Sequence, residues 1–305
     1  MLPVVLQSAV LIVCGVIWRI TRPLGIDPVI VRQVLTNLVF ILLLPALVLM
    51  VMWRAPLGLD TLRIAVLALF GLGIALGLIL LWLRFRPTAS PVMGAMVLAA
   101  TFPNATYLGL PVLEKTFGPW ARSVAIQYDL FACTPFLLTA GIALARRYGT
   151  HDGAPFSRFE LFKVPALWAA VVGAFFNSMK VPFPTWLSEL LTMMAAGVIP
   201  LMLISIGLSL QWPARARDRL AEITPVLVIK LLFTPLLVLG GAVAMGVAAP
   251  LSHAIVIEAA MPSMVIGLVI CDRYNLDTTL YAQLVTASTL VALASLPLWH
   301  LALTS

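Results

Sequence analysis

Charged residues are scarce in this sequence of 305 residues. Only 10% of the residues are charged, 62% are hydrophobic, and the mean hydropathy is +1.08. Soluble domains carry about 25% charged residues. The scarcity of charge excludes an ordinary soluble domain and indicates an integral membrane protein.

Cysteine and several functional signatures are also nearly absent. Cys14, Cys133 and Cys271 have unrelated spacings within apolar segments, which excludes a disulfide framework or a thiolate metal site. We expect all three to be buried small hydrophobic residues. No basic run is interleaved with exposed aromatic residues, so the excess of Lys and Arg over Asp and Glu does not indicate a nucleic-acid partner.

Apolar stretches of membrane-spanning length occupy most of the chain. A hydrocarbon core of about 30 Å needs about 20 helical residues, and the breaks between apolar stretches predict an all-α protein with ten transmembrane helices. Most Lys and Arg residues lie in alternate loops, so we expect both termini outside the cytoplasmic (inner) membrane. The predicted spans are 2–18, 34–53, 62–83, 91–112, 122–145, 163–180, 186–210, 223–248, 252–271 and 278–301.

The longest polar loop, residues 146–160, divides the chain into halves of five helices, residues 1–150 and 151–305. An odd number of spans in each half gives the halves opposite orientations, so their similarity would form an inverted repeat. Pro45, Pro103 and Gly109 correspond at a nearly constant offset to Pro200, Pro262 and Gly267. This pattern predicts a 5+5 inverted repeat.

Two of the predicted spans are interrupted by proline. Helix 4 contains Pro103-Asn104 and helix 9 contains Met261-Pro262-Ser263. Broken helices at corresponding positions of two halves indicate a transporter site, because half-helix N-termini attract anions. The alternative is that the prolines only kink two packed helices. The predicted substrate-binding residues are Pro103, Asn104, Thr106, Tyr107, Pro262 and Ser263.

These motifs resemble the auxin efflux carrier family over nearly the whole chain. The resemblance lies in Pro103-Asn104-x-x-x-x-Gly109-x-Pro111 with Phe117-Gly118, and in Met261-Pro262-Ser263 with Arg273-Tyr274-Asn275. It implies the fold of the bile acid:sodium symporters, within the bile/arsenite/riboflavin transporter superfamily. In that fold, helices 1, 2, 6 and 7 form a scaffold domain, and helices 3–5 and 8–10 form a transport domain with discontinuous crossing helices 4 and 9.

The resemblance also implies the function. Members of the family are secondary active transporters of organic anions with an elevator-type alternating-access mechanism. The implied substrate is a mono- or dicarboxylate or an auxin-like acid, and the short central loop fits bacterial members, which are often named malate or malonate carriers. The resemblance further implies a homodimer formed through the scaffold, including helix 2 or 7, in contact with membrane lipid.

Three of the charges inside predicted spans, Asp129, Lys230 and Glu258, are good candidates for function, because an intramembrane charge is by default a functional hypothesis. Glu258 begins a Glu-Ala-Ala-Met-Pro-Ser stretch that resembles the Glu-x-Gly-x-Gln-Asn stretch of bile acid:sodium symporters, whose Glu is a sodium ligand. By this resemblance Asn104, Asp129 and Glu258 would hold sodium, although Pro262-Ser263 replaces the two amide ligands. No other cofactor is expected.

Lys230 allows two interpretations. Its side chain can extend to the headgroups, or it can pair with Glu258 or Asp129 as a built-in cation. Asn104, Asp129, Lys230 and Glu258 are therefore the predicted coupling residues, and sodium coupling, proton coupling and uncoupled transport all stay open.

A membrane-embedded enzyme and a channel are the alternatives to a carrier. The sequence has no Asp-x-x-Asp or His-Glu pair, whereas enzymes need clustered acids or a nucleophile with its base. It also lacks the rings of like charge or repeated filter sequence expected of a channel. We therefore expect a carrier that is not an enzyme.

Overall fold

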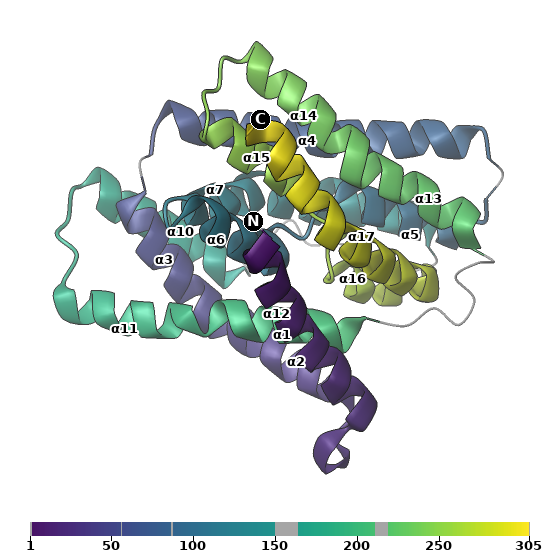
Figure 1. Ribbon diagram of the computed structural model, residues 1–305, viewed down its shortest axis with the longest axis horizontal. Coiled ribbons are helices and arrows are strands. Elements are labelled where there is room, and N and C mark those ends of the chain that lie inside the picture. The colour runs from purple at the N-terminus through teal and green to yellow at the C-terminus, as the bar shows by residue number, and fades with distance from the viewer. Residues whose placement is uncertain (1, 56, 87, 150–163, 211–218, 305) are drawn as a thin grey trace.

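The computed structural model describes residues 2–55, 57–86, 88–149, 164–210 and 219–304 (Figure 1). Most of the predicted central loop, residues 146–160, lies outside the described residues, and so does the predicted boundary between the halves at residue 150.

The regular elements of the described residues are helices. Several continue into one another through π-helical stretches, which are η2, η3, η4, η5 and η8. In chain order they are α1 (Leu2–Thr21), η1 (Pro23–Gly25), α2 (Pro28–Leu38), η2 (Val39–Leu43), α3 (Leu44–Arg54), α4 (Leu59–Arg84), α5 (Ser90–Thr101), η3 (Ala105–Gly109), α6 (Leu110–Phe117), α7 (Ala121–Tyr128), η4 (Asp129–Cys133), α8 (Thr134–Phe136), η5 (Leu137–Gly141), α9 (Ile142–Tyr148), α10 (Pro165–Ser178), α11 (Thr185–Ala196), α12 (Val198–Ser209), α13 (Leu220–Val228), η8 (Ile229–Phe233), α14 (Thr234–Ala244), α15 (Leu251–Ala259), α16 (Gly267–Arg273) and α17 (Thr278–Thr304).

Six helices among the described residues are long and apolar enough to cross a membrane, and three shorter apolar helices accompany them. The prediction of an all-α membrane protein is therefore confirmed. The long helices are Pro28–Arg54, Leu59–Arg84, Ala121–Tyr148, Thr185–Ser209, Leu220–Ala244 and Thr278–Thr304, and the shorter ones are Leu6–Thr21, Ser90–Thr101 and Pro165–Ser178. The predicted spans 91–112 and 252–271 are each interrupted.

Three of the prolines inside the long helices lie just after π-helical stretches. Pro45, Pro135 and Pro235 follow η2, η4 and η8, and a wider turn accommodates the proline ring and its missing N–H. The carbonyl of Leu231, four residues before Pro235, accepts a hydrogen bond from Trp299 Nε1 at 2.8 Å. The proline therefore leaves a backbone acceptor that joins η8 to α17.

The described helices pack as two groups. In the first helix group, residues 2–54 and 165–209, α1 packs on α12 and α10 packs on α3. In the second helix group, residues 59–148 and 220–304, α4, α5, α14, α15 and α17 pack together (Figure 1). Within the first group the backbones touch at Gly15 and Gly207, where a Cβ on Gly15 would lie 2.9 Å from the Cα of Gly207.

Polar side chains connect residues mainly within each group. Asn177 Nδ2, for example, donates to the carbonyl of Ala55 at 2.7 Å. Among the described residues, one side-chain hydrogen bond joins the two groups, from Lys115 Nζ to Gln7 Oε1 at 2.8 Å. The remaining contact between the groups is largely apolar.

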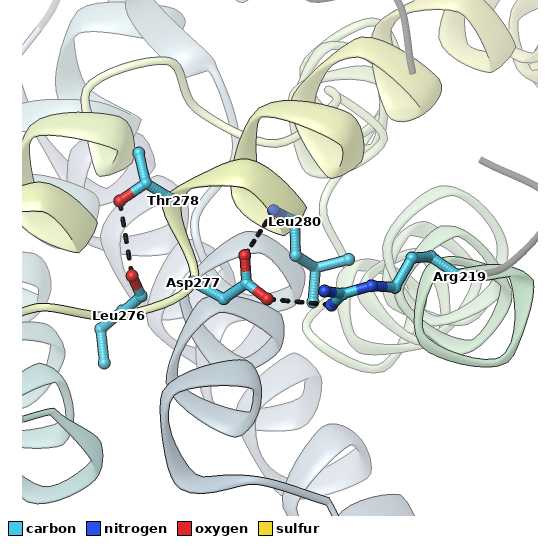
Figure 2. Close-up of polar contacts among 5 residues, drawn as sticks. All are labelled: Arg219, Leu276, Asp277, Thr278 and Leu280. Atoms are coloured by element: carbon cyan, nitrogen blue, oxygen red, sulfur yellow. Dashed lines mark hydrogen bonds and ion pairs between the residues drawn. The ribbon is translucent and has the colours of Figure 1, made fainter. Parts of the chain in front are cut away.

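A polar cluster holds one end of the second group together (Figure 2). Asp277 accepts from the backbone N–H of Leu280 at 2.8 Å, which caps α17, and pairs with Arg219 at 2.9 Å. The N–H of Asp277 also donates to the carbonyl of Pro91 at 3.1 Å. One aspartate thus joins the first residues of α5, α13 and α17.

Two replacements of Asp277 should show how much its cap of α17 and its ion pair with Arg219 each contribute to stability. Asp277→Ala removes the cap and the ion pair and should lower the stability by about 1–2 kcal/mol, whereas Asp277→Asn keeps an N-cap and should lose less. Asp60→Ala is the matched control, because its ion pair with Arg63 is exposed and joins neighbouring turns. Thermal unfolding of the purified protein in detergent measures the three variants. Equal effects of Asp277→Ala and Asp60→Ala would contradict this assignment.

Candidate functional site

The two proline breaks lie against each other. The N–H of Asn104 donates to the carbonyl of Pro262 at 2.8 Å, and the N–H of Met264 donates to the carbonyl of Phe102 at 3.1 Å. These bonds form an isolated antiparallel bridge between Pro103 and Ser263. Backbone groups in lipid must be satisfied within the protein, and here each broken segment satisfies groups of the other.

Ser263 belongs to the internal hydrogen bonding of this bridge. Its hydroxyl donates to the carbonyl of Ala99 at 2.8 Å, and its N–H donates to Ser288 Oγ at 3.1 Å. The hydroxyl of Tyr281 donates to the carbonyl of Met264 at 2.8 Å. The helix after this break resumes at Gly267 and not at Ser263.

A pocket of about 140 Å³ opens beside the bridge, between the two helix groups. It contains five predicted residues of the second group, and Phe40 and Leu44 line it from the first group. Pro262 and Ser263 do not line the pocket, where Met264, Val265 and Ile266 take their place. The predicted residues that line it are Pro103, Asn104, Thr106, Tyr107 and Asp129.

The first turn after the break faces this pocket. Asn104 is 4% exposed, and its Nδ2 has no hydrogen-bond partner. Ala105, Thr106 and Tyr107 follow it as the first turn of the helical segment Ala105–Phe117. The first N–H groups of a helix have no partner inside the helix, so this end presents donors to the pocket.

Asp129 lines the same pocket and is half-buried. Its carboxylate accepts hydrogen bonds from Thr106 Oγ1 and from Thr134 Oγ1, the latter at 3.1 Å. Thr134 reaches Asp129 because η4 places the two side chains together. The carboxylate thereby joins the broken helix to the helical segment Ala121–Tyr148.

Glu258 and Lys230 are buried close to the bridge. Glu258 is 0% exposed, and neither of its carboxylate oxygens has a hydrogen-bond partner. It packs against Gly109, where a Cβ would overlap the carboxylate. Lys230 is 1% exposed and donates to the carbonyl of Thr101 at 3.0 Å. Its ammonium group therefore reaches the C-terminal end of α5 and not the headgroups.

The predicted sodium ligands are not arranged as one site. Asn104 and Asp129 share the pocket, but Glu258 does not line it. Asp129 already accepts two hydroxyl hydrogen bonds, and the described residues contain no cluster of three or more His, Cys, Asp or Glu side chains that could hold a metal. Sodium requires several convergent oxygen ligands. Asn104 and Asp129 are thus the predicted sodium ligands that share the pocket, and sodium binding by all three residues stays a prediction.

Comparison with known proteins gives the family. A model described as "Membrane transport protein" matches residues 150–300. Residues 150–300 of this chain are therefore similar to a family of membrane transport proteins. Recognition of the auxin efflux carrier family from the broken-helix motifs is therefore confirmed.

Two archaeal proteins of similar sequence carry transporter names. An "Uncharacterized transporter" of Methanothermobacter thermautotrophicus is 29% identical over 301 residues, which cover 98% of this chain and 97% of that protein. The "Uncharacterized transporter MJ1031" of Methanocaldococcus jannaschii is 23% identical over 217 residues, which cover 68% and 67% of the two chains. The coarse prediction of a membrane transporter is thus supported.

Several residues that line the pocket could not be predicted from the sequence. Met264, Val265 and Ile266 reach the pocket because the chain is extended after Pro262, and Phe40 reaches it because the two groups pack there. Cys133 also lines the pocket and, like Cys271, is buried as expected, whereas Cys14 is exposed.

The contact between Gly109 and Glu258 predicts a specific steric effect. Gly109→Ala should lower the stability by about 1–3 kcal/mol, because the buried carboxylate has little room to move. Gly73→Ala is the matched control, since a Cβ there meets nothing within 4 Å. In a Glu258→Ala background the cost of Gly109→Ala should fall. Thermal unfolding checks all four proteins, and an unchanged cost in that background would contradict the contact.

Proposed function

We propose that this protein is a secondary active transporter that moves a small organic anion, a mono- or dicarboxylate or an auxin-like acid, by an elevator-type alternating-access mechanism. It would have ten transmembrane helices in a 5+5 inverted repeat and perform no catalysis. The observation that carries this proposal is the antiparallel contact of the two broken helices beside a pocket that holds an unpaired Asn104 amide. Similarity to a family of membrane transport proteins supports it.

An anion is the ligand that this pocket suits. The N-terminal end of the segment Ala105–Phe117 carries partial positive charge and free N–H groups, and Asn104 Nδ2 adds another donor. Phe40, Leu44 and Leu130 provide an apolar wall. A carboxylate would bind at Asn104 and the first turn, with its apolar body against this wall.

The carboxylate of Asp129 must be neutralised before an anion can bind beside it. A carboxylate held beside an ionised Asp129 would be repelled, so a proton on Asp129 favours binding. Sodium is the less favoured partner, because its predicted ligands do not share one pocket. Glu258 is buried without a partner, which also favours its protonated form. We therefore assign coupling to protons.

Lys230 would serve as a fixed cation. It donates to Thr101 at the C-terminal end of α5, where a helix carries partial negative charge. An ammonium group at this point would provide the built-in cation that is one of the two interpretations of Lys230.

The two helix groups would be the two parts that move. The first group, helices 1, 2, 6 and 7, is the scaffold, and the second group, helices 3–5 and 8–10, is the transport domain. Because polar contacts lie mainly within the groups, the second group can slide along a largely apolar surface. The cytoplasmic membrane of a bacterium, with both termini outside, and a homodimer formed through helix 2 or 7 of the scaffold are part of the same proposal.

Carboxylate binding should depend on Asn104. In a thermal-shift screen against monocarboxylates and malonate, a ligand at about 100 times its Kd stabilises the folded protein by about 2.7 kcal/mol. Asn104→Ala should lose this shift and keep its own melting temperature, because the amide Nδ2 stabilises nothing inside the protein. Asn37→Ala, an exposed amide in α2, is the control that keeps the shift. A normal shift in Asn104→Ala would contradict the assigned site.

Proton coupling predicts a pH dependence. Carboxylate affinity should rise as the pH falls, because the site must gain a proton before the anion binds. Asp129→Asn should bind with an affinity that no longer changes with pH, and Glu258→Gln should alter the cation dependence of transport. Binding titrations with and without sodium test this. Sodium-dependent, pH-independent binding would reject proton coupling.

A further inference from the structure

A second cavity lies at the interface between the two helix groups. Its volume is about 320 Å³, and Leu47 and Leu110 line it. The first pocket is lined by Leu44 and Tyr107, which lie three residues earlier in the same helical segments. Three residues of a helix rise by about 4.5 Å. The two cavities therefore follow each other along one interface, with this single turn of each helix between them.

The second cavity has an excess of positive charge. Lys115, Arg122 and Glu114 line it, so the charged lining residues sum to +1. Lys115 donates to the neutral amide of Gln7, and Arg122 pairs with one oxygen of Glu114. Arg122 Nε and Glu114 Oε2 are both buried without a hydrogen-bond partner. The cavity thus contains an ammonium group without an anionic partner and a guanidinium group with an unused buried donor.

From this arrangement we propose that the second cavity is a second binding site for the transported carboxylate, which we call the station. The segment Asn104–Leu110 separates the station from the first pocket. The carboxylate binds Arg122 and Lys115, and Gln7 and Glu114 release these side chains when it arrives. This inference rests on the proposed carrier function. It adds a second site to the path of the anion.

The geometry favours a small carboxylate over an inorganic anion. Apolar side chains also line this cavity, and they are Leu11, Leu47, Leu110, Ile199 and Leu203. The volume falls at the lower end of the range for small-molecule sites, about 300–1,000 Å³. An arginine can bind both oxygens of a carboxylate. An anion with an apolar body therefore satisfies both kinds of lining residue.

The hydrogen bond between Lys115 and Gln7 would couple binding at the station to the movement of the second helix group. It joins the transport domain to the scaffold, and it is the one side-chain hydrogen bond between the groups in the described part of the chain. A carboxylate that takes Lys115 away from Gln7 would remove that bond. Binding at the station would thereby free the second group to slide.

The charge of the cavity can be measured with cysteine reagents in the full-length protein. A cysteine is placed in the cavity lining by Ser8→Cys, or by Ala196→Cys if Ser8→Cys fails to fold, in a Cys14→Ala background. Anionic 2-sulfonatoethyl and cationic 2-(trimethylammonio)ethyl methanethiosulfonates are compared, each rate being divided by its rate with a free thiol. We expect a preference of about sixfold for the anionic reagent, as Coulomb's law gives for one net charge at about 8 Å in a hydrated site.

Charge variants test which residues create this preference. Arg122→Gln should abolish it, Arg122→Lys should keep it, and Glu114→Gln should increase it. Arg63→Gln, which removes an arginine outside the cavity, should have no effect. Malonate should slow labelling of the cavity cysteine in the parent protein but not in Arg122→Gln.

The outcomes separate this inference from the proposed function. Equal normalised rates for the two reagents, or a preference that persists in Arg122→Gln, would overturn the station. A preference without protection by malonate would also overturn it, since the cavity would then be positive without binding a carboxylate. Asn104→Ala should leave the labelling preference unchanged, so failure of the first pocket as a substrate site would not be mistaken for failure of the second.

Discussion

The reciprocal backbone hydrogen bonds between the two proline breaks are the interaction on which the rest of this structure depends. A proline inside a membrane helix leaves backbone groups that lipid cannot satisfy. Asn104 and Pro262 share one bond of the bridge, and Met264 and Phe102 share the other. Because each break completes the other, irregular backbone can persist in the interior of an apolar protein. The pocket, the free end at Ala105 and the buried charges all lie around this bridge.

Hydrogen bonds are concentrated within the helix groups, and few of them cross between the groups. Ser263, Tyr281, Lys230 and Asp277 bond within the second helix group, and they hold its broken and continuous helices as one body. At the interface between the groups, the first group is apolar at Leu44 and Leu47, and polar residues gather at two cavities. An apolar interface resists displacement weakly, because it has few directional bonds to break. A carrier that moves one body along another needs this distribution.

Much of the fold could be predicted from local chemistry. Long apolar stretches allow only helices in lipid, and Pro103-Asn104 and Pro262-Ser263 locate the interruptions because proline cannot continue the helical bonding. The same reasoning identified Asn104, Thr106, Tyr107 and Asp129, which the structure brings to one pocket. It was wrong for Ser263, whose donors are used internally. It was also wrong for Cys14, which is exposed, because an apolar sequence does not say which side of a helix faces lipid.

The sequence by itself determined the class of protein, the helical segments, the two breaks and the family, since each follows from composition, from proline or from short motifs. The tertiary structure decided where the polar groups of those segments point. Lys230 could reach headgroups or the interior, and only the packing of η8 against α5 directs it to Thr101. Met264, Val265 and Arg122 entered the sites only through packing, because contacts between segments far apart in the chain depend on how whole helices are placed, and no local pattern encodes that placement.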